Sequence, residues 1–256
     1  MGGRTLPGAP MPSEEPHATG RTSVVIPTLN EGRSIGQVLD ELPRGLLEVI
    51  VVDGNSRDDT QAIARSKGAR VVVEPRKGYG RAYKTGFLEA RGDFIATLDG
   101  DVTYPAERIG ELVGLLVADG LDFITCDRLS HLRRDAMSAK HRFGNFVLSV
   151  ASRVLFRVPV KDSQSGMWVF RRELLKDMTL TSDGMAFSEE LKVEAFRARP
   201  GRCREVPIEY RARVGEPVLS SWSDGVANLN FLLRKRFCGA RGVRGDLFRV
   251  EDAPSP

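Results

Sequence analysis

The chain is predicted to form a single α/β domain with a mostly parallel central sheet flanked by helices. Apolar runs of strand length alternate with helical patterns through the first half, and such alternation favours crossover connections between parallel strands. Several of these runs end in a carboxylate. A chain of 256 residues that is 41% hydrophobic can also bury the core of one sizeable domain.

The first half supplies five expected strands. The apolar run in 22–27 stops at Pro27, and polar residues then open a helix at 32–42. A second apolar run at 48–53 ends in Asp53 and leads into a helix at 57–67. The remaining elements of this half are expected at 70–74 (strand), 79–90 (helix), 93–98 (strand), 105–118 (helix) and 121–126 (strand).

Beyond Asp127 the regular alternation stops. The expected elements are a long helix at 135–157, a short strand after the polar segment 162–166, a helix at 187–198, a strand at 203–210 and a last helix at 223–236. Residues 1–20 are rich in Pro, Gly, Ser and Glu and lack an apolar signal-peptide core, so a disordered tail is expected there. The folded domain is placed at 21–237 and a C-terminal tail at 238–256.

The tripeptide Asp99-Gly100-Asp101 follows the apolar run 94–98. Two carboxylates one residue apart point into the same loop, where their repulsion would be relieved by a hard divalent cation. Mg²⁺ or Mn²⁺ bound there could hold a diphosphate. The alternative is a solvated turn, because Asp-Gly is also ordinary turn chemistry.

Other carboxylates recur where strands end. In an open parallel sheet these ends form the crevice that binds ligands, so Glu31 and Asp53 are expected to converge with Asp99 and Asp101. Asp53 could instead cap its own turn. The segment 77–80 places glycines at a helix start, where backbone N–H groups could face phosphate, although a flexible helix entry would read the same.

Composition limits the function classes. Lys and Arg exceed Asp and Glu by 38 to 34, giving a net charge of +4 that suits anionic partners. No basic stripe interleaved with aromatic residues and no zinc spacing is present, so nucleic acid is not an expected partner. The three cysteines are isolated in sequence, which favours reduced thiols and a cytoplasmic setting. No segment has the roughly 20 uninterrupted apolar residues of a spanning helix.

Five motifs stand in the order and spacing of a known family. They are Pro27 to Glu31, Asp53 to Thr60, Lys77 to Gly80, Ala90 to Asp93 and Asp99 to Asp101. The chain resembles the family 2 glycosyltransferases, in particular the dolichol-phosphate mannose synthase-like branch, over roughly residues 22 to 237. The resemblance implies a GT-A type fold, with a nucleotide-sugar half at 21–127 and an acceptor half at 128–237.

The resemblance also implies roles for particular residues. Asp99 and Asp101 would bind Mg²⁺ or Mn²⁺, and Arg128 and Arg142 would hold an acceptor phosphate. Arg213 opens a loop that would close over the donor. The nucleotide-sugar-binding residues would be Pro27, Leu29, Glu31, Asp53, Lys77, Gly78, Asp99, Gly100, Asp101 and Arg213.

Three positions depart from the family pattern. Pro217 and Val218 replace the Ser-Lys pair of the donor loop, which weakens the expected partnership with Arg213. Thr103 stands where the mannose synthases often have glutamine. Leu29 stands where many relatives have an aromatic residue, so the contact with base or ribose is uncertain.

The expected function is inverting, metal-dependent transfer of a hexose from a nucleotide sugar of the GDP-mannose or UDP-glucose type to polyprenyl or dolichyl phosphate. Asp101 and Arg128 would be catalytic, and a phosphate nucleophile, already anionic, would need cationic groups rather than a base. The alternative is a hydroxyl acceptor, with Glu189 or Glu190 as the base.

Peripheral contact with the cytoplasmic face of a membrane is also expected. Apolar residues recur at helical spacing in 143–155, beside Arg142, Arg153 and Arg157, and 231–233 lead into a basic run at 234–236. The alternative is that both apolar faces pack on the core.

Overall fold

The computed structural model describes residues 18–130, 139–214 and 221–238. Its seven-stranded sheet has the order β3-β2-β1-β4-β6-β5-β7, and every pairing is parallel except those made by β6. The strands are β1 (Thr22–Thr28), β2 (Glu48–Asp53), β3 (Arg70–Val73), β4 (Phe94–Thr97), β5 (Phe123–Asp127), β6 (Trp168–Arg171) and β7 (Cys203–Pro207).

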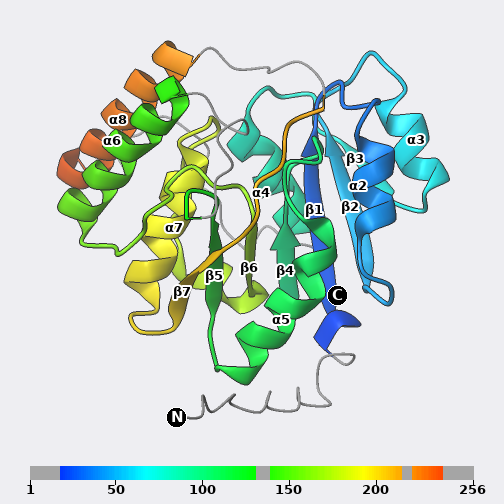
Figure 1. The fold of residues 1–256 in the computed structure, drawn as a ribbon, viewed down its shortest axis with the longest axis horizontal. Coiled ribbons are helices and arrows are strands. Elements are labelled where there is room, and N and C mark those ends of the chain that lie inside the picture. Colours follow the sequence, from blue (N-terminus) through cyan, green and yellow to red (C-terminus); the bar gives the residue numbers. More distant parts are fainter. Residues whose placement is uncertain (1–17, 131–138, 215–220, 239–256) are drawn as a thin grey trace, which may run out of the picture.

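Helices cover both faces of this sheet (Figure 1). They are α2 (Ile35–Glu41), α3 (Thr60–Ser66), α4 (Tyr79–Glu89), α5 (Ile109–Ala118), α6 (Ala139–Phe156), α7 (Phe187–Ala198) and α8 (Ser221–Cys238), with short 3₁₀ turns η1 (Ala106–Arg108) and η2 (Arg172–Asp177). Side chains alternate between the two faces of a strand. Val24 and Ile26 of β1 therefore pack in one core with α2, α3 and α5, and Val25 packs in the other with α4 and α7.

The α/β class and the mostly parallel sheet predicted from the sequence are confirmed. The long helix expected at 135–157 appears as α6, while residues 131–138 lie outside the described residues. One boundary differs: Ala18 and Thr19, assigned to the disordered tail, are buried. The Thr22 hydroxyl and the Arg21 amide donate to the Ala18 carbonyl, which fixes this turn against the start of β1.

The sheet topology decides which segments meet at the site. The carboxyl ends of the parallel strands lie along one edge, where β2 ends in Asp53 and β4 leads into Asp99. Because β6 runs the opposite way, the segment before it, residues 162–166, lies at this same edge. A single reversed strand therefore brings a segment of the second half against the carboxylates of the first.

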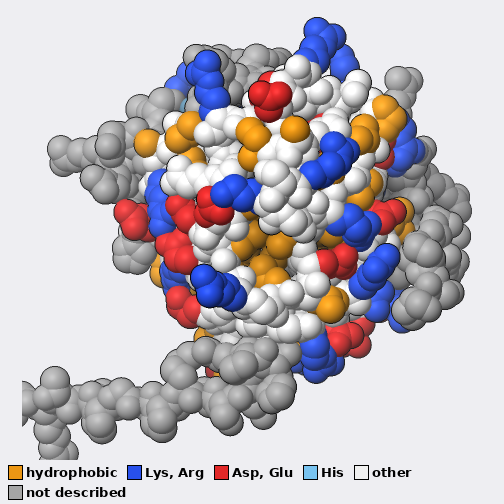
Figure 2. All heavy atoms as spheres, turned by 90° about the vertical axis from the view of Figure 1, so that its right-hand side faces the viewer, with side chains coloured by type: hydrophobic (Ala, Val, Ile, Leu, Met, Phe, Trp, Pro, Cys, Tyr) orange, Lys and Arg blue, Asp and Glu red, His pale blue; other side chains and the backbone are white. Residues whose placement is uncertain are grey.

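The two helices α6 and α8 pack against each other beside α7 (Figure 1). No helix among the described residues is long and apolar enough to cross a membrane. On the face near β3, shown in Figure 2, acidic and basic side chains are interspersed rather than gathered into one stripe. That part of the surface offers no single-sign field to a polyanion.

Candidate active site

Asp99 and Asp101 lie in the loop after β4, as expected. The Tyr79 hydroxyl donates to Asp99 Oδ1 over 3.0 Å. Burial, reinforced by the negative charge of Asp101, raises the pKa of Asp99 to about 7. The protein thus holds a carboxyl group here at a cost that a bound cation would relieve.

Asp101 is almost fully buried and is oriented through both oxygens. Its Oδ1 accepts from the Thr103 amide at 3.1 Å and from the Thr103 hydroxyl at 2.6 Å. Its Oδ2 lies 3.0 Å from Arg213 Nη1. Between them Val102 has φ of 61°, a conformation that is strained for a β-branched residue and concentrates at functional sites. Thr103, a departure from the family pattern, therefore orients the second carboxylate.

Arg213 bridges two of the predicted carboxylates. Its Nη2 lies 2.6 Å from Glu31 Oε1, and its Nη1 reaches Asp101. Backbone hydrogen bonds from Arg211 to Thr103 and from Val214 to Asp101 fix this segment on either side of the guanidinium. The structure therefore brings Glu31, Asp99, Asp101 and Arg213 together, although they come from distant parts of the chain.

The carboxylates are chemically suited to a divalent cation. Within the described residues, no three His, Cys, Asp or Glu side chains gather closely enough to hold a metal ion by themselves. Asp99 and Asp101 would supply only part of the shell, leaving positions for phosphate oxygens and water, as Mg²⁺ commonly requires. Gly100 between them packs on β1, where an added Cβ would lie 3.0 Å from the Thr28 methyl group.

Asp53 is fully buried at the end of β2, and its oxygens already accept hydrogen bonds. Oδ1 accepts from the Ser56 amide at 2.8 Å and Gln61 Nε2 at 2.7 Å. Oδ2 accepts from the Ser56 and Thr28 hydroxyls. This is the turn-capping arrangement kept as an alternative, and the base or ribose contact stays a prediction. Near this edge, Pro27 is half-buried and Leu29 is 39% exposed.

Lys77 and Gly78 lie at the start of α4 and are exposed. Gly78 has φ of 140°, and a Cβ there would lie 2.1 Å from the Asp183 carbonyl oxygen. The Gly80 and Arg81 amides donate to the Gly184 and Asp183 carbonyls. Two of the N–H groups of the helix start thus have protein partners, and the glycine at 78 is required by packing. The donor contacts of Lys77 and Gly78 remain predictions.

Arg128 follows β5 at the same edge, and its side chain forms a salt bridge with a buried carboxylate. Its Nε and Nη2 donate to Asp162 over 2.7 and 2.9 Å, and Asn145 Nδ2 donates to the same carboxylate. Both ions are buried. The guanidinium of Arg128 holds the pKa of Asp162 below its usual range against the opposing effect of burial. Arg128 also lies over the Tyr210 ring, 5.1 Å from its centroid, and its Nη1 takes no part in the pair.

Arg142 is exposed on the first turns of α6, one turn from Asn145. It lines a hollow of about 380 Å³ with Leu129, Phe143 and Phe146. Leu129 follows Arg128 in the chain, so this basic and aromatic hollow reaches the segment that carries Arg128.

The two glutamates at the start of α7 have different environments. Glu190 is fully buried, and its oxygens accept from the Thr181 and Ser182 amides, the Thr181 hydroxyl and Lys235 Nζ. These bonds hold Glu190 as an anchor between α7 and α8, with no oxygen turned to the site. Glu189 accepts one hydrogen bond from Gln164, while its buried Oε2 has no partner among the described residues. Burial raises the pKa of Glu189 to about 8.

Sequence reasoning gave no role to segment 162–166, Tyr79 or Tyr104. Gly166 lies directly against Asp99, because an added Cβ would be 2.4 Å from the Tyr79 hydroxyl and 3.1 Å from Asp99 Oδ1. The Gly166 amide donates to the Tyr104 hydroxyl at 2.7 Å. The only sequence signal was the polar run 162–166 between two apolar stretches, which did not indicate which side of the sheet it would join.

With this geometry in place, comparison with known proteins is informative. The profile of glycosyl transferase family 2 matches residues 23–179. The chain belongs to glycosyltransferase family 2. The family predicted from the motifs is therefore confirmed, and the matched region contains Glu31, Asp53, Asp99, Asp101 and Arg128.

Two similar proteins come from Haloferax volcanii. A dolichyl-phosphate hexose transferase is 36% identical over 208 residues, which cover 80% of this chain and 89% of that protein. The low-salt glycan biosynthesis hexosyltransferase Agl6 is 36% identical over 218 residues, or 82% of this chain. The aligned region spans only 52% of the length of Agl6.

Similar solved structures include glucosyl-3-phosphoglycerate synthase from Mycobacterium tuberculosis. Its complex with Mn²⁺, UDP-glucose and glycerol 3-phosphate matches with a TM-score of 0.71 at 25% identity, covering 91% of this chain and 86% of that one. The same enzyme has been crystallised with Mg²⁺ and UDP. The match confirms the GT-A type fold.

Proposed function

We propose that the protein is an inverting, metal-dependent hexosyltransferase that moves a hexose from a nucleotide sugar to a polyprenyl phosphate such as dolichyl phosphate. The observation that carries this proposal is the placement of a buried arginine, Arg128, at the same sheet edge as the paired carboxylates Asp99 and Asp101. Arg128 could bind an anionic acceptor, and a metal ion on Asp99 and Asp101 could bind an anionic donor. The name of the relative from Haloferax volcanii, which refers to dolichyl phosphate, points the same way.

The donor side rests on the carboxylates. Mg²⁺ or Mn²⁺ bound by Asp99 and Asp101 would offset the charge that builds on the departing diphosphate. The cationic side chain of Arg213 lies beside this pair, with its Nη1 3.0 Å from Asp101 Oδ2. Its guanidinium can donate two parallel hydrogen bonds to a phosphate and cannot lose its charge. Arg213 would exchange Asp101 for the diphosphate when the donor arrives.

The acceptor side rests on the arginines. A polyprenyl phosphate oxygen is already anionic at neutral pH, so it needs orientation rather than deprotonation. Arg128 would hold this phosphate while Asp162 fixes the guanidinium. Arg142 would guide it from the hollow beside Leu129. Attack from the face opposite the departing diphosphate, in a single displacement, would invert the anomeric centre.

The helices α6 and α8 would rest on the membrane that contains such an acceptor. On α6 an outward stripe of Phe143, Phe146, Val150 and Val154 is exposed, Phe143 by 62% and Val154 by 72%. On α8 Val226, Leu233 and Phe237 form a second exposed stripe, whereas Leu232 is buried. Core packing therefore accounts for only part of the apolar surface of these helices.

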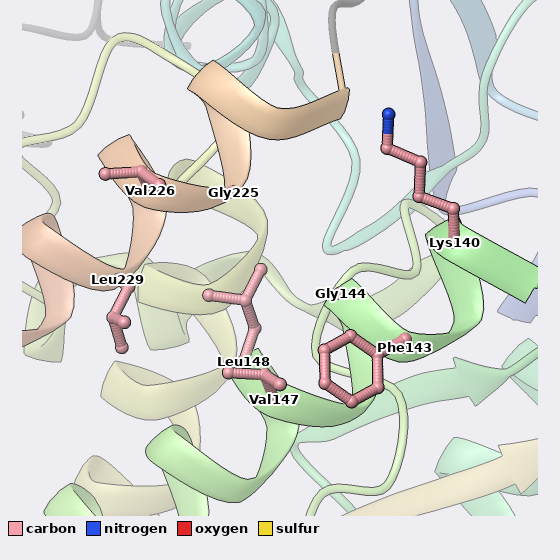
Figure 3. Close-up of a pocket in the computed structure, with 8 residues that line it drawn as sticks. All are labelled: Lys140, Phe143, Gly144, Val147, Leu148, Gly225, Val226 and Leu229. Carbon is pink, nitrogen blue, oxygen red and sulfur yellow. The ribbon is translucent and has the colours of Figure 1, made fainter.

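Between the two helices lies an apolar cavity of about 180 Å³. Figure 3 shows side chains of α6, including Val147 and Leu148, across from Val226 and Leu229 of α8, with the Lys140 amine pointing away from them. An apolar opening with one basic residue, Lys140, at its end matches a phosphate on a hydrocarbon chain.

The function is tested by assaying the purified chain with a panel of GDP- and UDP-hexoses, with and without polyprenyl phosphate, in Mg²⁺, Mn²⁺ or EDTA. We expect a lipid-linked hexose of inverted anomeric configuration, formed only when metal is present. Transfer to a soluble hydroxyl compound with none to polyprenyl phosphate would contradict the proposal.

Membrane contact is tested by sedimentation with anionic vesicles at low and high salt. Basic residues near anionic lipid contribute about 1 kcal/mol each, so we expect binding that weakens as salt rises. Phe146→Ser should bind the vesicles more weakly than wild type at the same salt concentration. Val73→Ser, on the exposed edge strand β3, serves as the matched control and should bind as wild type does. Equal binding by both variants would argue against the α6 stripe.

A hydroxyl acceptor is the second candidate, favoured by one observation. Glu189 has a buried oxygen with no partner in the part of the chain that the structure describes, and its pKa is raised; both features are typical of a general base. Arg128→Ala and Glu189→Gln separate the two candidates. A phosphate acceptor predicts the larger loss of transfer in Arg128→Ala, and a hydroxyl acceptor predicts it in Glu189→Gln.

A further inference from the structure

Lys192 is a fully buried lysine on α7 that reaches beneath segment 162–166. Its Nζ donates to the carbonyl oxygens of Asp162 at 2.9 Å, Ser163 at 2.8 Å and Ser165 at 2.8 Å. Its side chain is only 1% exposed, and the Ser188 hydroxyl lies 3.4 Å from Nζ. No carboxylate forms a salt bridge with it among the described residues.

Three backbone carbonyls that point to one position repel one another unless hydrogen-bond donors lie between them. Burial lowers the pKa of Lys192 to about 7, so the ammonium and the neutral amine both occur near neutral pH, and either form donates N–H groups to these carbonyls. Ser188 adds a hydroxyl donor to the Ser163 and Ser165 carbonyls, at 3.2 and 2.9 Å, and Trp168 Nε1 donates to Ser165 at 2.8 Å. The curvature of segment 162–166 therefore depends on donors supplied from α7 and β6.

This segment joins the two sides of the proposed site. At its start, the Asp162 carboxylate fixes the Arg128 guanidinium. At its end, Gly166 lies against Asp99 and the Tyr79 hydroxyl. The separation between the acceptor-side arginine and the donor-side carboxylate is therefore set by the path of five residues, and Lys192 holds the inner side of that path.

We propose that Lys192 is a positioning residue that aligns Arg128 with the carboxylates at Asp99 and Asp101 by holding the carbonyls of segment 162–166. The proposal rests on the proposed function, because it concerns the alignment of the acceptor with the donor. Lys192 touches neither substrate. Its removal should impair the step that needs both substrates in register more than the binding of either one.

The chain also offers a matched control. Lys84 of α4 is likewise buried, at 2% exposed, and its Nζ contacts the Thr181 carbonyl and Asp183. It is held against a different segment, outside 162–166. Replacing either lysine with methionine keeps most of the length of the side chain and removes its N–H donors, so both variants lose a buried amine but only one releases segment 162–166.

The experiment compares transfer to polyprenyl phosphate with hydrolysis of the donor by water in wild type, Lys192→Met and Lys84→Met. Misalignment of about 1 Å can cost roughly 100-fold in rate. We expect Lys192→Met to lower kcat for transfer about 100-fold, with donor hydrolysis and the calorimetric Kd for the Mn²⁺ nucleotide within about threefold of wild type. Lys84→Met should keep the wild-type ratio of transfer to hydrolysis.

Equal losses of transfer and hydrolysis in Lys192→Met would overturn the proposal, since they would indicate a general loss of folded protein. If Lys192→Met does not fold, Ser188→Ala decides, because Ser188 donates to two of the same carbonyls. A ratio of transfer to hydrolysis about tenfold below wild type supports positioning, and an unchanged ratio overturns it. Wild type failing to use polyprenyl phosphate would refute the proposed function instead, and the ratio would then be measured with the acceptor that it does use.

Discussion

Two arginine clusters at the same sheet edge are built for opposite purposes. In the outer cluster, Arg213 pairs with Glu31 and Asp101, and its side chain is 31% exposed. In the inner cluster, Arg128 pairs with Asp162, its side chain is 9% exposed, and Asp162 is fully buried. Both arginines bridge distant parts of the chain, but the outer one is much more exposed to solvent.

A ligand can replace a protein contact in the outer cluster more easily than in the inner one. Water and a phosphate can reach the Arg213 pair, so that exchanging Asp101 for a ligand costs little. The Arg128 pair is enclosed by further donors from Asn145 and from the Gln164 amide, and opening it would leave a buried charge uncompensated. The outer cluster is suited to rearrange in turnover and the inner cluster to remain in place.

The largest expected effect is in the outer cluster. Asp101→Asn should reduce transfer roughly a thousandfold or more, because metal-held charge on the diphosphate contributes several kcal/mol to such a reaction. Asp99→Asn should weaken transfer severely. Both variants should keep the wild-type circular dichroism spectrum and melting curve within a few degrees. Full activity in either variant, or in EDTA, would rule out the metal role of this pair.

The second-largest expected effect is on the free energy of unfolding, which should depend more on the inner cluster than on the outer one. Asp162→Asn leaves Arg128 buried without its counter-ion and should lower the free energy of unfolding by about 3 kcal/mol or more. Glu31→Gln leaves Arg213 half-exposed and should cost at most about 1 kcal/mol. Urea unfolding at pH 7 measures both. Similar losses in the two variants would remove the distinction drawn between the clusters.

Burial of the Glu189 carboxyl group should make the free energy of unfolding depend on pH. Its pKa is raised to about 8 in the folded protein, so the native state binds more protons than the unfolded chain above the ordinary glutamate pKa. This contribution to stability therefore falls as pH rises from about 4.5 to 8. Glu189→Gln resembles the protonated acid and should be more stable than wild type by several kcal/mol, up to about 4 kcal/mol, at pH 8.

The check is urea unfolding of wild type and Glu189→Gln at intervals between pH 4.5 and pH 8. The gap between the two should be near zero at the acid end and widen steadily. A constant gap would mean that the Glu189 carboxyl titrates normally in the folded protein.

The smallest expected effect concerns the exchange at Arg213. Arg213→Ala frees Asp101 Oδ2, so Mn²⁺ alone should bind about fivefold more tightly, a change of about 1 kcal/mol typical of a partly exposed ion pair. The Mn²⁺ nucleotide should bind more weakly, because the guanidinium no longer meets the diphosphate. Calorimetric titration measures both. Arg211→Ala is the control, since its side chain pairs with Glu41 and Glu107. Parallel changes in the two variants would count against an exchange at Asp101.

The amino-acid sequence was enough to predict the class of fold, the edge of the sheet that carries the site and the pair Asp99 and Asp101. These follow from local patterns: apolar runs ending in carboxylates and helical stretches between them fix parallel strands whose ends converge. The five motifs also identified the family. None of these inferences requires a contact between the two halves of the chain.

The remaining features of the site depend on contacts between segments that are distant in sequence. Because β6 is antiparallel to its neighbours, Gly166 lies against Asp99 and Asp162 binds Arg128. A four-residue apolar run does not indicate the direction in which its strand joins the sheet. Glu189 and Glu190 are neighbours in sequence, yet one is saturated by hydrogen bonds and the other is not. Burial and pairing depend on which segments of chain meet, so the roles of such residues are set by long-range packing and not by local spacing.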